Sequence, residues 1–104
     1  MKIKILVVDD ELLLRDVLFD YLNRQGFEVN LAPDAEKALE LTENYTPDIA
    51  LIDIKLPKIS GIELTKILKN NNPDLPIIIM TGYPSLDTAI NAMENGANEY
   101  IVKP

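Results

Sequence analysis

Acidic residues stand at the ends of two apolar runs in this sequence. Asp9 and Asp10 follow the apolar residues 5–8, and Asp53 follows the apolar residues 49–52. Such runs are typical of buried parallel strands, and the ligands of an open parallel sheet bind beyond the carboxyl ends of its strands. If the two strands are neighbours, three carboxylates meet at one edge. Two such charges repel by roughly 4 kcal/mol at about 4 Å and an effective dielectric constant of about 20. The sequence therefore predicts a cation-binding site at this edge.

Composition narrows the class of protein. The 104 residues suffice for one domain with a single core, and 47% of them are hydrophobic, as in ordinary globular proteins. The net charge of −7 argues against direct nucleic-acid binding. No apolar run reaches the ~20 residues of a membrane span, and the first residues lead into a strand rather than a signal peptide. We expect a cytoplasmic location and no membrane partner.

Histidine and cysteine are both absent. Their absence excludes disulfides and removes the commonest general base and the commonest transition-metal ligand. Carboxylates, by contrast, suit Mg²⁺, which takes one or two of them together with waters and phosphate oxygens.

Strands and helices are predicted to alternate along the chain. Apolar and alternating runs predict strands over residues 3–8, 27–31, 49–52, 77–80 and 100–102. Apolar residues at three- and four-residue spacing predict helices over 11–25, 35–44, 62–70 and 86–94. Strict alternation indicates a parallel sheet with right-handed crossovers.

Helix ends carry their own signals. Asp34 and Ser85 can cap the second and fourth helices, and Gly26 and Gly96 can end the first and fourth. In the first helix we expect the apolar residues to face inward: Leu14, Val17, Leu18, Tyr21 and Leu22.

Four groups of residues at the predicted strand ends, together with residues of one loop and of the last strand, resemble a response regulator receiver domain, the phosphoacceptor part of a bacterial two-component system. The strand ends carry Asp9-Asp10, Asp53, Thr81 and Lys103-Pro104; Pro57 and Gly61 follow in the loop after Asp53; Gly96-Ala97 precede the last strand and Tyr100 lies within it. The resemblance covers residues 1–104 as one receiver domain. It implies an α/β, flavodoxin-like, doubly wound sheet of five parallel strands in the order 2-1-3-4-5.

The resemblance also implies a phosphoacceptor site. Asp53 is the residue that becomes phosphorylated. Asp10 binds Mg²⁺ directly, Asp9 holds the ion through water, and the backbone carbonyl of Lys55 is a further ligand. Carboxylates do act as nucleophiles in enzymes with an aspartyl-phosphate intermediate, so the implied chemistry is sound.

Further residues follow from the same resemblance. Thr81 and Lys103 bond phosphoryl oxygens, and Tyr100 is the aromatic switch residue that reports phosphorylation together with Thr81. Lys55 and Tyr83 flank the site and tune the lifetime of the phosphoryl group. The bond between Lys103 and Pro104 is often cis in the family.

Each marker has a simpler interpretation when it is taken alone. Asp9 or Asp10 could cap the first helix, and Thr81 could be a turn hydroxyl. Lys103 could be an ordinary terminal lysine, and Tyr100 could be half-buried packing. The metal-site and phosphoacceptor hypotheses depend on finding these residues together.

The predicted function is a Mg²⁺-dependent phosphoacceptor switch, not an enzyme, with at most slow autodephosphorylation. Because the chain has no histidine, the donor must be a separate sensor histidine kinase or histidine phosphotransfer protein. The signal leaves through the face of the fourth helix and fifth strand. An aspartate-nucleophile phosphatase is disfavoured, because such enzymes need an acid two residues after the nucleophile, and that position is occupied by Lys55 in this sequence. A phosphorylation-independent interaction module on the same fold is the remaining alternative.

The resemblance implies a fifth helix after the last strand, and we expect none within these 104 residues. In the family, that helix covers one sheet face and buries three or four large apolar side chains. At ~1.5–3 kcal/mol for each side chain, its absence removes roughly 5–10 kcal/mol of stabilisation. We therefore expect the uncovered face to be occupied by another molecule or to make the protein self-associate.

Overall fold

The computed structural model describes residues 1–103 and contains one five-stranded parallel sheet in the order β2-β1-β3-β4-β5. The strands are β1 (Lys4–Val8), β2 (Glu28–Ala32), β3 (Ile49–Asp53), β4 (Ile77–Thr81) and β5 (Glu99–Val102). The helices of the described residues are α1 (Leu12–Arg24), α2 (Ala35–Thr42), α3 (Gly61–Asn71) and α4 (Leu86–Glu94). The fold class and strand order predicted from the sequence are confirmed.

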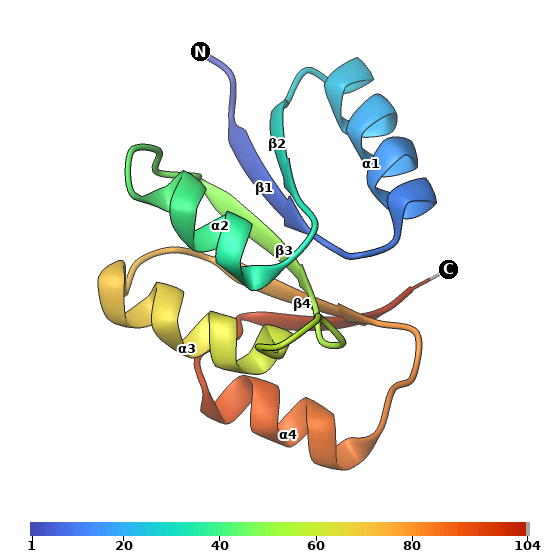
Figure 1. Ribbon diagram of the computed structural model, residues 1–104, viewed down its shortest axis with the longest axis vertical. Helices are drawn as coiled ribbons and strands as arrows, with labels where there is room; N and C mark the ends of the chain where they lie inside the picture. Colours follow the sequence, from blue (N-terminus) through green and yellow to red (C-terminus); the bar gives the residue numbers. More distant parts are fainter. Residues whose placement is uncertain (104) are drawn as a thin grey trace.

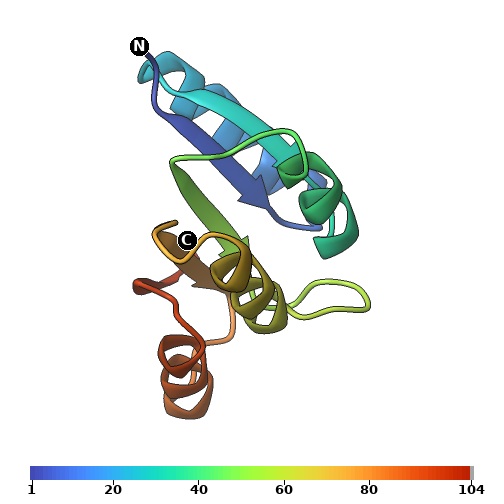
Figure 2. The same cartoon turned by 90° about the vertical axis from the view of Figure 1, so that its left-hand side faces the viewer.

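Helices cover the two faces of the sheet unequally (Figures 1 and 2). On one face, α2, α3 and α4 pack over the main core, to which the strands contribute mostly aliphatic residues: Leu6, Val8, Ala50, Ile52, Ile77 and Ile79. The parallel register aligns Leu6 with Ala50, and Ile52 with Ile79, so their side chains point to this same face. This core holds β1, β3 and β4 side by side and thereby fixes the spacing of their carboxyl ends.

The opposite face is covered by α1, which packs Leu18 and Leu22 against Ile5, Val7 and Val29. Within residues 1–103, α1 is the only helix on this face.

Two residues of α1 depart from the predicted pattern. Val17 and Tyr21 were expected to face inward, and they are instead 55% and 58% exposed. The helix points Leu18 and Leu22 at the sheet, and this rotation leaves Val17 and Tyr21 at its flank. Ile101 of β5 is also exposed on the α1 face, because it aligns with Met80 and lies beyond the reach of α1. The predicted absence of a fifth helix and the predicted domain bounds 1–104 stay predictions.

Helix termini follow the expected chemistry. Asp34 accepts a hydrogen bond from the Lys37 N–H at 2.8 Å, and Ser85 accepts one from the Thr88 N–H at 3.1 Å. Gly26 has a φ of 94°, a left-handed conformation that favours glycine after a helix. No helix in the described part of the chain combines the length and the apolar character that crossing a membrane needs.

Candidate functional site

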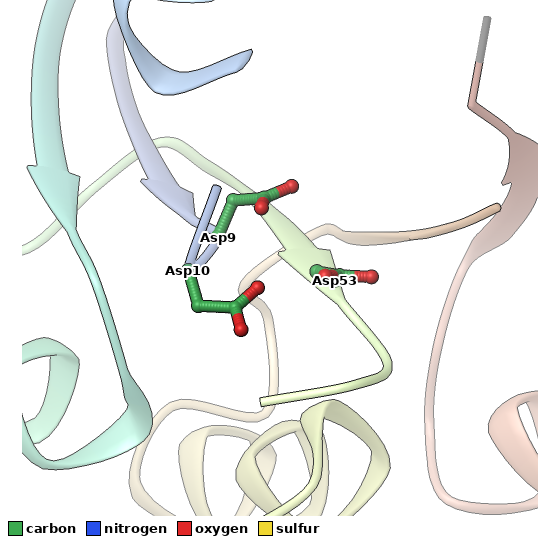
Figure 3. A group of neighbouring side chains, drawn as sticks. All are labelled: Asp9, Asp10 and Asp53. Carbon is green, nitrogen blue, oxygen red and sulfur yellow. The ribbon is translucent and has the colours of Figure 1, made fainter. Parts of the chain in front are cut away.

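The three predicted carboxylates come together at the carboxyl edge of the sheet (Figure 3). β1 and β3 are neighbours with Val8 aligned to Ile52, so Asp9 follows β1 directly beside Asp53, the last residue of β3. One oxygen from each of Asp9, Asp10 and Asp53 lies within 4.8 Å of the others. Asp9 is fully buried and Asp53 is 5% exposed, whereas Asp10 is open to solvent. This set of hard oxygen donors fits a divalent cation such as Mg²⁺.

Lys103 supplies the internal positive charge of the cluster. Its Nζ lies 2.8 Å from Asp9 Oδ2 and 3.1 Å from Asp53 Oδ2, with its side chain only 9% exposed. Glu11 Oε1 is 3.7 Å from the same ammonium group, and this acid was not among the predicted site residues. One ammonium therefore stands among three carboxylates, and the cluster keeps a surplus of negative charge.

Burial and charge shift the pKa values of this cluster. Burial raises the pKa of Asp53 above its ordinary value, and the charge of Asp9 raises it further, while contact with Lys103 opposes the change. Burial disfavours the charged form of Lys103, but its contacts with Asp9 and Asp53 outweigh that cost and raise its pKa. The raised pKa of Asp53 means that its ionised form is disfavoured, and the raised pKa of Lys103 means that negative charge surrounds its ammonium. A further cation at this position would stabilise ionised Asp53.

Hydrogen bonds hold the backbone around Asp9, whose own N–H donates to the Ala32 carbonyl at 3.1 Å. Asp9 Oδ1 accepts from the Glu11 N–H at 2.8 Å, and Arg15 Nη1 donates to the Asp9 carbonyl at 2.7 Å. Glu11 is the N-cap residue of α1 and its side chain makes no capping bond. The N-cap position of α1 is thus Glu11 and not Asp9 or Asp10, and Asp9 contributes to this end of the helix through its bond with the Glu11 N–H. Arg15, which the sequence reading missed, fixes the turn that carries both acids.

A half-open cleft of about 230 Å³ lies over the carboxylates and is lined by residues from every strand end of the site: Asp10, Glu11, Asp53, Lys55, Thr81, Gly82, Tyr83 and Lys103. Thr81 is buried, and its Oγ1 accepts a hydrogen bond from the Tyr83 N–H at 3.0 Å. Across the mouth of the cleft, the Lys55 ammonium lies 4.2 Å from the centroid of the Tyr83 ring, a cation–π distance. The predicted flanking residues thus contact each other.

Tyr100 lies apart from the carboxylates, on the α4 side of the sheet. It aligns with Ile79, and its hydroxyl is 2.7 Å from Thr88 Oγ1 and accepts from the Ser85 N–H at 3.4 Å. The Thr81 and Tyr100 hydroxyls therefore have different partners in this conformation. The predicted cis bond between Lys103 and Pro104 lies outside the described residues.

The arrangement can hold a hard cation and place one buried carboxylate as a nucleophile. Lys103 and Thr81 can donate to an anionic group in the cleft, and Asp53 can attack it. These groups meet at the carboxyl edge of a parallel sheet in the order 2-1-3-4-5, the edge at which such sheets bind their ligands.

Comparison with known proteins gives the family. The family model of the response regulator receiver domain matches residues 5–104. A two-component response regulator, PhoP of Pseudomonas aeruginosa, is 41% identical over 101 residues, which cover 97% of this chain and 45% of PhoP. The chain therefore belongs to the response regulator receiver domain family. It spans less than half the length of this curated relative.

Solved structures agree with this result. A receiver domain protein described as CheY-like, from Methanospirillum hungatei, superposes with a TM-score of 0.96 at 36% identity over all of this chain and 83% of its own. A response regulator from Burkholderia pseudomallei, with a phosphorylated aspartic acid, a calcium ion and citrate, superposes with a TM-score of 0.94 at 33% identity, covering 99% of this chain and 61% of that one.

Proposed function

We propose that this domain is a Mg²⁺-dependent phosphoacceptor switch. A phosphohistidine on a separate kinase or phosphotransfer protein donates its phosphoryl group to Asp53: an Asp53 oxygen forms the new bond to phosphorus, and the bond from phosphorus to the histidine nitrogen breaks. Lys103 and Thr81 donate to the phosphoryl oxygens. Asp9, Asp10, Asp53 and the Lys55 carbonyl hold Mg²⁺, which supplies charge neutralisation for those oxygens when it is bound.

The observation that carries this proposal is the pairing of a buried, charge-strained Asp53 with a single internal ammonium. Asp53 Oδ2 lies 3.1 Å from Lys103 Nζ, and two more carboxylates lie within 4.8 Å. The Asp53 carboxylate lines a cleft, lies at the end of a strand and is surrounded by too little positive charge. These properties suit phosphoryl transfer, which depends on positioning and charge neutralisation. The Burkholderia relative carries both a phosphorylated aspartic acid and a divalent ion.

Incubation with acetyl phosphate and Mg²⁺, followed by intact mass spectrometry, tests the proposal. A persistent adduct of one phosphoryl group supports a phosphoacceptor. Steady consumption of acetyl phosphate without an adduct indicates a phosphatase. No change in mass and no turnover indicates an interaction module that works without phosphorylation.

Asp10 is expected to matter more for Mg²⁺ than Asp9 does. At a Mg²⁺ concentration one hundred times its Kd, the parent gains about 2.7 kcal/mol of stability. Asp10→Asn should lose most of this gain while its metal-free melting temperature stays close to the parent's, because Asp10 is exposed. Thermal melts with and without Mg²⁺ measure both quantities.

Two variants calibrate that experiment. Asp16→Asn removes an exposed acid of α1 and should keep the full gain from Mg²⁺. Asp9→Asn should retain more of the gain than Asp10→Asn but should melt lower without metal, because Asp9 is buried against Lys103. Equal Mg²⁺ stabilisation in Asp10→Asn and the parent contradicts the assignment.

The switch is proposed to couple Thr81 to Tyr100. On phosphorylation the Thr81 hydroxyl leaves the Tyr83 N–H for a phosphoryl oxygen, and the Tyr100 hydroxyl leaves Thr88 for the space that Thr81 vacates. Thr88 lies in the first turn of α4, so loss of its bond to Tyr100 changes how α4 is held on β5. The surface that would report this change carries the exposed apolar residues Leu86, Ile90, Met93 and Val102.

We expect beryllofluoride, a phosphoryl mimic, to exchange both hydrogen bonds. Crystal structures of the protein with and without it should show Thr81 and Tyr100 in new side-chain conformations. Thr81→Ala should still accept a phosphoryl group but lose the movement of Tyr100, whereas Thr88→Val should release Tyr100 without any ligand. Unchanged side chains of Thr81 and Tyr100 in a site that contains beryllofluoride would refute the coupling.

Self-association is a second proposal, and it rests on the apolar side chains exposed on the α1 face: Val17, Tyr21 and Ile101. Light scattering over a range of concentrations should show species larger than the monomer. Ile101→Lys should reduce their fraction, and a monomer at every concentration would contradict the proposal.

A further inference from the structure

Gly61, the first residue of α3, lies directly against the backbone of the proposed phosphoacceptor. A Cβ atom built on Gly61 would stand 1.9 Å from the Asp53 carbonyl oxygen, 2.7 Å from its carbonyl carbon and 3.0 Å from Ile52 Cγ2. The first two atoms belong to the backbone and cannot rotate away. Only a residue without a side chain fits here, so α3 starts in contact with the end of β3.

Hydrogen bonds hold Gly61 in this place from both sides. Its N–H donates to the Ile54 carbonyl at 2.7 Å, and its carbonyl accepts from the buried hydroxyl of Thr65 at 2.8 Å. The bond to Ile54 closes the base of loop 54–60, and that loop carries Lys55. Gly61 therefore contacts Asp53 and also closes the loop that contains the proposed carbonyl ligand.

We propose that Gly61 is a positioning residue for the phosphoacceptor site, an inference that rests on the proposed function. Its missing side chain sets how closely α3 approaches β3, and this approach fixes Asp53 and Lys55 relative to Asp10 and Lys103. A Cβ atom at 1.9 Å must move by about 1 Å to reach the 3.0 Å that such contacts keep. The Asp53–Lys103 separation of 3.1 Å leaves no room for such a displacement without loss of alignment.

Gly61→Ala should therefore impair the chemistry beyond any loss of stability. A misplacement of about 1 Å can cost roughly a hundredfold in rate, so we expect phosphorylation by acetyl phosphate to slow by ~10- to 100-fold. The Kd for Mg²⁺, followed by amide NMR titration, should rise severalfold. Both measurements are made well below the melting temperature of the variant, where the protein is folded.

Two other glycines provide matched controls for a merely structural effect. Gly26 and Gly96 have φ angles of 94° and 107°, so alanine strains the backbone at either position. Both precede strands and lie at the edge of the sheet opposite the carboxylates. Gly26→Ala and Gly96→Ala should melt lower than the parent and still bind Mg²⁺ and accept phosphate as the parent does.

A second variant, at Thr65, tests the position of Gly61 if Gly61→Ala does not fold. Thr65→Val keeps the shape of the side chain and removes the hydroxyl that holds the Gly61 carbonyl, and it should weaken Mg²⁺ binding in the same direction by a smaller factor. The inference is overturned if Gly61→Ala and Thr65→Val, or whichever of the two folds, keep the phosphorylation rate and the Mg²⁺ Kd of the parent. A parent that neither binds Mg²⁺ nor gains mass shows instead that the proposed function has failed.

Discussion

Asp53→Asn is expected to abolish the phosphoryl adduct. The amide keeps the shape of the side chain and removes the nucleophilic oxygen. Asp9 is fully buried and does not line the cleft, and Asp10 belongs to the proposed metal site, so neither is expected to replace Asp53. Incubation with acetyl phosphate and Mg²⁺ should leave the mass of the variant unchanged. An adduct on Asp53→Asn would show that another residue accepts the phosphoryl group.

The same variant should be more stable than the parent in the absence of metal, which separates loss of chemistry from loss of fold. Burial and the charge of Asp9 raise the pKa of Asp53, so its ionised form carries a cost at neutral pH that a neutral amide avoids. A raised pKa means that this cost appears as the pH rises from the ordinary value of 3.8 through the folded value. Stabilising substitutions of this kind contribute about 0.5–2 kcal/mol. Asp53→Asn should therefore melt several degrees higher at pH 7 and show no advantage below pH 3.8.

Local patterns in the sequence were sufficient to predict the sheet and its order of elements. The apolar runs that become β1, β3 and β4 are buried on the face of α2, α3 and α4 and buried or half-buried on the α1 face, so their hydrophobicity is continuous and easy to recognise. The cap residues Asp34 and Ser85 act through bonds three residues away, which a sequence reading can anticipate. The exposure of Val17 and Tyr21 depends on how α1 is rotated on the sheet, which the spacing of its apolar residues alone does not determine.

The acids of the site were predictable for a related reason. Residues that end neighbouring parallel strands must share an edge, so the sequence alone predicts that Asp9 and Asp53 lie together. The contacts that support these residues could not be predicted from the sequence. Arg15 reaches back to the Asp9 carbonyl, and Thr88 meets Tyr100 across α4 and β5. These bonds depend on side-chain conformations and on distances between elements that no residue pattern specifies.

Lys103→Met should cost more stability than any other single charge removal in this domain. The change leaves Asp9 and Asp53 buried beside each other without the ammonium that lies 2.8 and 3.1 Å from them. Breaking a buried ion pair by removing one partner costs about 3–5 kcal/mol. Because 1 kcal/mol corresponds to roughly 4–8 °C in a domain of this size, the melting temperature at pH 7 should fall by at least about 10 °C. Thermal melts measure the loss directly.

A surface ion pair of similar length provides the control. Arg24 Nη2 lies 3.0 Å from Asp20 Oδ2 on α1, with the two side chains 74% and 65% exposed. Arg24→Met should cost no more than about 0.5 kcal/mol, because solvent screens exposed pairs. If Arg24→Met and Lys103→Met lose equal stability, the burial of the Lys103 cluster does not determine its energy.

The pH dependence and a second substitution identify the cause of that loss. In the parent, the pKa of Lys103 is raised, so its stabilising contribution is complete below the ordinary value of 10.5 and is lost as the pH rises through the folded value. Without the ammonium, the pKa of Asp53 rises further, so Lys103→Met should recover stability relative to the parent as the pH falls and Asp53 becomes protonated. Combining Lys103→Met with Asp53→Asn should recover part of the loss at pH 7, because one of the two facing charges is then gone. A double variant no more stable than Lys103→Met would show that Lys103 stabilises the fold through packing and not through the charges of Asp9 and Asp53.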